Sequence, residues 1–192
     1  MTTIYPVENQ PNDQFGYSIY SLVIPAGEEL TTQVEAIRNQ VGVTVASIPA
    51  HITVKGPIFN IASLEQVKQL VKAITSNAAP FFISFQGSQF HWGSTGGGLG
   101  VVVTPPLQVL HDALVATISP LGLPAYRDDP YHAHMTLVYG QSPEKIEEVK
   151  EWINQMDFGP GIQADAVNLV GRVGPRVGGQ WMLIERFALG GI

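Results

Sequence analysis

Residues 50–54 read AHITV and residues 133–137 read AHMTL, so one pattern of alanine, histidine, an apolar residue, threonine and an apolar residue occurs twice. Each copy is typical of a short strand and is followed by a turn and a helical pattern. Successive side chains of a strand point to opposite faces, so in each copy the histidine and the threonine share one face, roughly 7 Å apart. We therefore expect each strand to bury its apolar side and to present an imidazole and a hydroxyl group on the other.

The rest of the chain indicates helices and strands arranged around these two segments. Apolar residues at helical spacing predict four helices, at residues 30–41, 64–74, 107–118 and 142–153. Strand-like runs occur at residues 17–24, 50–55, 81–90, 99–104, 132–139, 166–173 and 181–189. Two pairs of runs are joined by glycine-rich stretches like hairpins, which pair strands antiparallel. The stretch at residues 93–100 leads into a strand, so we interpret it as a flexible hairpin loop and not as a phosphate-binding loop.

The repeated strand, turn and helix predict two pseudo-equivalent lobes that face one cleft. No linker separates the halves, so residues 1–192 are expected to form a single bilobal domain. The predicted fold class is α+β, with mainly antiparallel sheets lining the central cleft and helices outside. With 45% hydrophobic residues, the chain can bury a core of its own.

Composition and charge exclude several classes of function. Cysteine is absent, which excludes disulfide bonds, a thiol nucleophile and zinc held by cysteine. The net charge of −6 repels a long polyanion, so a nucleic-acid partner is expected to be a mononucleotide, a short oligomer or a chain end. No apolar run reaches the ~20 residues of a membrane span, and residues 1–16 lack the features of a secretory signal. We expect a cytoplasmic monomer without a membrane partner.

Two histidines and two threonines in this arrangement suit the cleavage of a phosphodiester. In-line attack on phosphorus needs a base that takes a proton from water and an acid that gives one to the departing oxygen. Histidine, with an unperturbed pKa of ~6.5, can do either near neutral pH. Threonine hydroxyl groups can donate hydrogen bonds to the non-bridging oxygens. A single His-x-Thr segment is more typical of ordinary strand packing, but two copies in matching frames favour a shared site.

The segments HITVKGPIF at residues 51–59 and HMTLVYG at residues 134–140 resemble the two His-x-Thr/Ser motifs of the 2H phosphoesterase superfamily. That group includes 2′-5′ RNA ligase-like proteins and cyclic phosphodiesterases. The resemblance covers most of the chain, because motif spacing and lobe order also match. It implies a bilobal fold with a pseudo-two-fold axis, no metal or other cofactor, and hydrolysis of 2′,3′-cyclic or related phosphodiesters.

The resemblance also implies roles for individual residues. By motif position, His51 and His134 are the expected catalytic pair, and Thr53 and Thr136 are expected to bind the phosphoryl group. The residues at 139–140 are tyrosine and glycine, where several RNA-ligase-like members have an arginine. This ending is more similar to that of the small cyclic phosphodiesterases than to that of the RNA-ligase-like members.

Four further residues are candidates for substrate contacts. Lys55 is expected to follow Thr53 on the histidine face and to serve as an extra basic residue. His132 precedes His134 on the same face and could tune it, touch substrate or share a metal with it. Tyr131 and Phe59 flank the motifs, and we expect at least one of them to line the cleft, where an aromatic ring could stack on a nucleobase. No metal is expected, because the neighbouring acidic residues do not supply a ligand pattern.

These observations predict an enzyme that hydrolyses 2′,3′-cyclic nucleotides or related cyclic and 2′-5′ phosphodiesters through a pair of histidines. Its partner is then a small nucleotide or an RNA end. Two alternatives stay open. The chain could bind a nucleotide or a 2′-5′ oligonucleotide without turnover, or it could join RNA ends through a 2′-5′ bond. The sequence does not decide which histidine is the base.

Overall fold

A computed structural model gives the arrangement of most of the chain. It describes residues 12–40, 42, 48–89, 96–124, 130–138, 141–175 and 179–191, without the side chains of residues 87–89 and 123–124. The tyrosine and glycine at 139–140 lie outside the described residues. No helix in the described part of the chain is long and apolar enough to cross a membrane.

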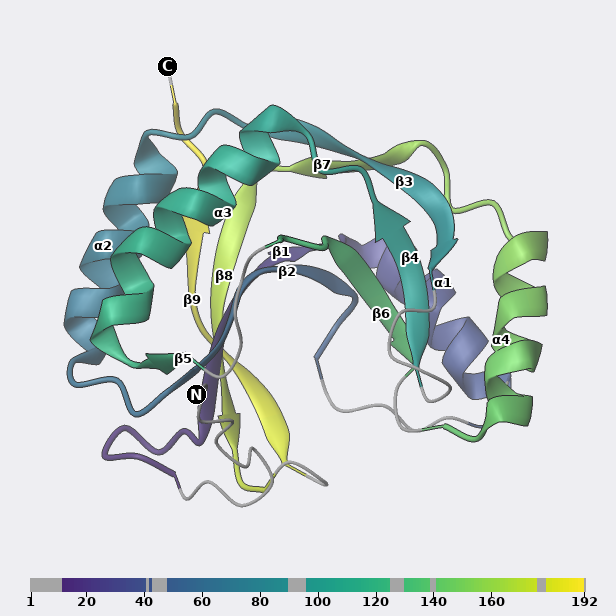
Figure 1. Cartoon of the computed structure of the whole chain (residues 1–192), viewed down its shortest axis with the longest axis horizontal. Coiled ribbons are helices and arrows are strands. Elements are labelled where there is room, and N and C mark those ends of the chain that lie inside the picture. The colour runs from purple at the N-terminus through teal and green to yellow at the C-terminus, as the bar shows by residue number, and fades with distance from the viewer. Residues whose placement is uncertain are drawn as a thin grey trace.

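One curved sheet of nine described strands forms the centre of the molecule (Figure 1). Its order is β7-β3-β4-β6-β2-β1-β8-β9, with the short strand β5 paired to β2. Every strand pair within the described residues is antiparallel. The strands are β1 (Ile19–Pro25), β2 (His51–Phe59), β3 (Phe81–Gln89), β4 (Gly97–Val101), β5 (Leu123–Pro124), β6 (His134–Val138), β7 (Gly161–Ala164), β8 (Ala166–Val173) and β9 (Gln180–Ala188).

The four α-helices of the described residues pack on the sheet in two pairs (Figure 1). Helices α2 (Leu64–Ser76) and α3 (Pro105–Ile118) contact each other and cover β2, β8 and β9 at one end. Helices α1 (Glu28–Gln40) and α4 (Pro143–Gln155) contact β6 and β3 at the other. A single turn of 3-10 helix, η2 (Ser119–Leu121), follows α3. The expected α+β class, with antiparallel strands and helices outside, is confirmed.

The helix boundaries follow the signals in the sequence. The hydroxyl group of Ser63 accepts a hydrogen bond from the backbone of Gln66, and Ser142 caps α4 in the same way, with a proline at the first helical position. Helices α3 and α4 bury the whole apolar stripe that their spacing predicts, whereas in α2 Val67 and Val71 are buried and the rest of the stripe is partly buried. In α4 the buried residues are Ile146, Val149 and Ile153. Capping and periodicity together explain why these helices form where the sequence predicts them.

The glycine-rich stretch differs from the prediction. Residues 97–100, interpreted above as part of a hairpin loop, form most of strand β4, which pairs with β6. Gly98 explains the composition: a Cβ atom there would lie 1.9 Å from the carbonyl oxygen of Met135, so β4 approaches β6 closely only because the side chain is missing. Glycine therefore serves close strand packing here, beside the second histidine motif.

Two short strands were not predicted. β7 has four residues and begins with a glycine at positive φ, so it lacks the alternating pattern that marks a longer strand. β5 has two residues and contains a proline. Both strands form by pairing with a strand that is distant in sequence: β7 pairs with β3, and β5 pairs with β2.

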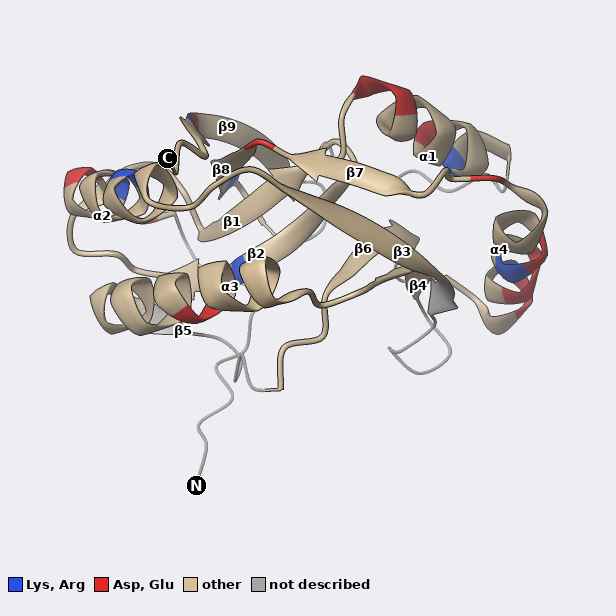
Figure 2. Cartoon of the chain, turned by 90° about the horizontal axis from the view of Figure 1, so that it is seen from above, with Lys and Arg blue, Asp and Glu red and all other residues tan. Residues whose placement is uncertain are grey.

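Acidic residues lie along the outer helices α1 and α4 (Figure 2). The two motif strands, β2 and β6, contain no aspartate or glutamate. The net charge of −6 is thus not carried by the strands that present the two motifs. This separation suits an anionic substrate at the motif strands, because like charges close to a phosphate would repel it.

Candidate active site

The two motif strands lie next to each other at the centre of the sheet. Ile52 of β2 pairs with Met135 of β6, and both side chains are buried in the core. Continuing this antiparallel register by one residue places His51 opposite Thr136, on the other face of the sheet. Residues directly opposite in such a pair have Cβ atoms ~4.5–5.5 Å apart. The imidazole of one motif therefore stands beside the hydroxyl group of the other.

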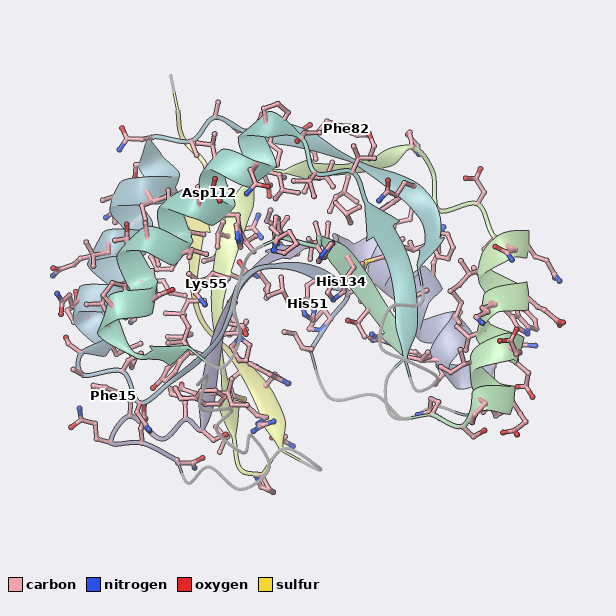
Figure 3. All side chains as sticks on the ribbon, viewed as in Figure 1. Phe15, His51, Lys55, Phe82, Asp112 and His134 are labelled. Carbon is pink, nitrogen blue, oxygen red and sulfur yellow. The ribbon has the colours of Figure 1, made fainter. Side chains whose placement is uncertain are left out.

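Continuing the register from Ile52 and Met135 by one residue in the opposite direction places Thr53 opposite His134. We call the side of β2 and β6 that carries both histidines and both threonines the motif face. On it, His51 and His134 are diagonal neighbours, for which a separation of ~7–8 Å is expected. Figure 3 shows the two histidines together at the junction of the strands. A phosphoryl group between them would have one imidazole on each side and a hydroxyl group beside each.

Both histidines are held in the same tautomer. The Nδ1 atom of His51 lies 2.8 Å from the carbonyl oxygen of Pro49, and Nδ1 of His134 lies 2.8 Å from that of His132. A carbonyl oxygen can only accept, so Nδ1 donates in each case. In the neutral ring the lone pair then resides on Nε2. The two motifs thus present their imidazoles in equivalent orientations, as the pseudo-two-fold repeat predicts.

The pKa of His51 is lowered from its ordinary value. Burial of the ring is the main cause, because desolvation disfavours the imidazolium form. The hydrogen bond to Pro49 opposes this effect, whereas the positive charges of Arg38 and of protonated His134 reinforce it. His51 is therefore neutral at neutral pH, which is the form of a general base.

Arg38 is a site residue that the sequence did not reveal. It is 7% exposed on α1, and its Nε and Nη2 atoms donate to the carbonyl oxygens of Leu137 and Thr136, at 2.8 and 3.1 Å. Its guanidinium group thus holds the backbone of the second motif, and its charge acts on His51 of the first. The sequence offered no signal, because one arginine on an amphipathic helix looks like an ordinary surface residue.

The structure places Lys55 away from the motif face. Val23 pairs with Thr53, but the next residue of β1, Leu22, pairs with Lys55, so β2 contains one extra residue. Leu22 is fully buried, and Lys55 is 1% exposed. Figure 3 shows Lys55 apart from the two histidines. The expectation that strict alternation keeps Lys55 beside Thr53 is wrong, because the bulge interrupts the alternation.

Tyr131 supports the first motif. Its hydroxyl group donates to the carbonyl oxygen of Thr53 at 2.9 Å, and its ring stacks on that of His111 at 3.8 Å between centroids. His111 in turn donates from Nδ1 to the carbonyl oxygen of Val54 at 2.6 Å. The two rings therefore satisfy the backbone of β2 where the bulge interrupts its ladder. Contact of Tyr131 with a nucleobase stays a prediction.

The remaining two candidates for substrate contacts, Phe59 and His132, differ in the exposure of their side chains. Phe59 is 1% exposed and belongs to the apolar core region, so it cannot stack on substrate in this conformation. The side chain of His132 is exposed, and its backbone carbonyl orients His134. Among the described residues, no three histidine, aspartate or glutamate side chains gather in a group that could hold a metal ion.

A curved antiparallel sheet with paired His-x-Thr strands defines a 2H phosphoesterase. The sequence model of the 2′-5′ RNA ligase superfamily matches residues 26–176, and the chain belongs to this family. Membership supports a phosphodiesterase or a 2′-5′ ligase type of activity. A search of the curated proteins found no match.

Solved structures share the fold over nearly the whole chain. TT0787 of Thermus thermophilus is 16% identical, with a TM-score of 0.67, and the match covers 90% of this chain and 98% of that one. LigT of E. coli complexed with NADP⁺ is 16% identical, with a TM-score of 0.63 and coverage of 91% and 99%. LigT complexed with 3′-AMP is 15% identical, with a TM-score of 0.60 and coverage of 89% and 97%. At these identities the likeness shows the fold.

Proposed function

We propose that this protein is a metal-independent phosphodiesterase that hydrolyses 2′,3′-cyclic nucleotides, or cyclic phosphates at RNA ends, to monoesters. The observation that carries the proposal is the register of Ile52 with Met135, because it brings both His-x-Thr motifs to one face of the sheet. Two acid/base groups and two hydroxyl donors around one point are the groups that such a hydrolysis uses. Family membership supports this type of chemistry.

The environment of His51 supports the role of base for this residue, and His134 is then the acid. Neutral His51 takes a proton from water through Nε2 while the water oxygen bonds to phosphorus. The bond from phosphorus to one ribose oxygen breaks, and protonated His134 gives its Nε2 proton to that oxygen. Thr53 and Thr136 donate to the non-bridging oxygens, where negative charge accumulates. The lowered pKa of His51 supports its assignment as the base.

The test is hydrolysis of a panel of 2′,3′-cyclic nucleotides in the presence of EDTA, with chromatographic identification of the monoester. Turnover in EDTA is the expected result, and the isomer released shows which ribose oxygen departs. Formation of a 2′-5′ bond from RNA ends, without hydrolysis of the panel, would instead establish the ligase. Binding of the nucleotides without either reaction would establish a binding module.

The pH dependence of kcat/KM tests the role of His51. We expect a bell-shaped profile in which activity on the acidic side is lost as His51 becomes protonated. Because the pKa of His51 is lowered, this acidic limb lies below the ordinary pKa of histidine. Replacing Arg38 with methionine removes a positive charge near His51, which raises its pKa and moves this limb to higher pH.

A matched variant separates charge from structure in this experiment. Arg38→Lys keeps the charge but not the paired hydrogen bonds to β6, so its acidic limb is expected to stay close to that of the wild type. An unchanged limb in Arg38→Met would contradict the assignment of His51 as the base.

A further inference from the structure

A small pocket adjoins His51 on the side away from the second motif strand. It has a volume of about 140 Å³. Its walls come from β1, from the segment before β2, and from the hairpin of β8 and β9. The residues that line it include Val23, Pro49, Asn168, Val170, Trp181 and Leu183, together with His51 itself. The pocket is therefore continuous with the proposed active site.

The register of the sheet explains how these side chains reach one place. Val23 pairs with Asn168, and Val170 pairs with Leu183, so residues from three neighbouring strands line up across the sheet. Val23 also pairs with Thr53, a motif-face residue. Paired residues lie on the same face of a sheet. The pocket thus extends the motif face from the histidines toward the edge strand β9.

The size and walls of the pocket suit a single flat ring. A site for a whole drug-sized ligand usually measures ~300–1,000 Å³, so about 140 Å³ admits only one part of a nucleotide. The walls are mainly aliphatic and aromatic, and Leu183 is 59% exposed although it is large and apolar. Trp181 supplies an indole, which is a surface that nucleobases stack on. The guanidinium carbon of Arg172 lies 6.0 Å from the centre of this indole ring.

Asn168 supplies a polar group in these apolar surroundings. Its Oδ1 atom is buried and has no hydrogen-bond partner among the described residues. Buried polar atoms in native proteins are nearly always paired, so an unpaired one needs an explanation. A half-turn of the amide exchanges oxygen and nitrogen at almost no change in shape. Asn168 can therefore offer a donor or an acceptor to the edge of a heterocyclic ring.

We propose that this pocket is the subsite for the nucleobase of the substrate, with Trp181 and the aliphatic walls packing on the ring and Asn168 binding its edge. This inference rests on the proposed function, because it assumes a substrate phosphate between the two histidines. It adds the place where the base binds: residues of β8 and β9 then favour a cyclic phosphate that carries a base over a sugar cyclic phosphate without one.

The test compares a 2′,3′-cyclic nucleotide with ribose 2′,3′-cyclic phosphate, which lacks the base. In the wild type, kcat/KM is expected to be at least about tenfold higher for the nucleotide, in line with the contribution of one stacked base. Trp181→Ala and Asn168→Leu should each lower this ratio. Val173→Ala is the matched control, because it removes apolar surface from β8 at a 41% exposed residue that does not line the pocket. Equal rates on both substrates in the wild type would overturn the subsite and leave the proposed function intact.

A binding experiment decides the subsite even if neither compound is hydrolysed, which would contradict the proposed function. The probes are adenosine and cytidine, titrated into isotope-labelled protein. The indole N–H resonance of Trp181, assigned by its loss in Trp181→Phe, is expected to shift on addition of a nucleoside. Asn168→Leu should weaken this response, and Val173→Ala should preserve it. An unmoved Trp181 resonance at saturating nucleoside would refute the proposal.

Discussion

Replacing His51 or His134 with alanine is expected to lower kcat for a 2′,3′-cyclic nucleotide by ~10²–10⁴-fold. In the proposed mechanism each imidazole carries one of the two proton transfers, and the hydrogen bonds at Nδ1 leave Nε2 of both rings to perform them. Apart from the two histidines and Lys55, neither motif strand contains a side chain that is an acid or a base. The measurement is steady-state hydrolysis in EDTA.

Two further variants make the result specific to the pair. His132→Ala removes an exposed imidazole two residues before His134 but keeps the carbonyl group that orients it, so only a modest loss is expected. The double variant of His51 and His134 should lose little more than the worse single variant, because the two residues act in one step. Near wild-type activity in either single variant would exclude paired-histidine catalysis.

Replacing Thr53 or Thr136 with valine is expected to lower kcat by up to ~10²–10³-fold, the usual effect of removing one donor from an oxyanion site. Valine keeps the branched shape that suits a strand and removes only the hydroxyl group. The structural contacts of both positions use backbone carbonyl oxygens, which accept from Tyr131 and from Arg38, so valine leaves these contacts in place.

Serine at the same positions is the matched control, because it restores the hydroxyl group. Thr53→Ser and Thr136→Ser are expected to retain most of the activity, and circular dichroism with thermal unfolding should show that all four variants fold. Equal activity in the valine and serine variants would show that the hydroxyl groups do not bind the phosphoryl oxygens.

The antiparallel class and the helices could be predicted because both depend on local patterns. Ser142 and the proline after it mark the start of α4, and apolar residues at helical spacing mark its buried stripe. The two strands His51–Phe59 and His134–Val138 could be predicted from alternation alone. The alternation of side chains along a strand also predicts that the histidine and the threonine of each motif share one face. This prediction does not require knowing how the strands pair.

Other features depend on partners that are distant in sequence. Strand β4 can pair with β6 because Gly98 has no side chain to collide with the carbonyl oxygen of Met135. A count of glycines in the sequence does not reveal this contact. The position of Lys55 is decided by a bulge against β1, which shifts it from the motif face to the partner position of Leu22. Trp181 and His51 line the same pocket because β1 and β8 join their two strands, β9 and β2, into one sheet.

The sequence by itself determined the two motifs, the residues that share a face within each strand, and the helices that cover the sheet. These properties follow from the period of side chains along one segment. Only the tertiary structure decided the register of Ile52 with Met135, and with it the distance between the histidines. It also decided the place of Arg38, whose two hydrogen bonds join α1 to the second motif. Register and long-range contacts result from how distant segments pack together, and no local pattern contains that information.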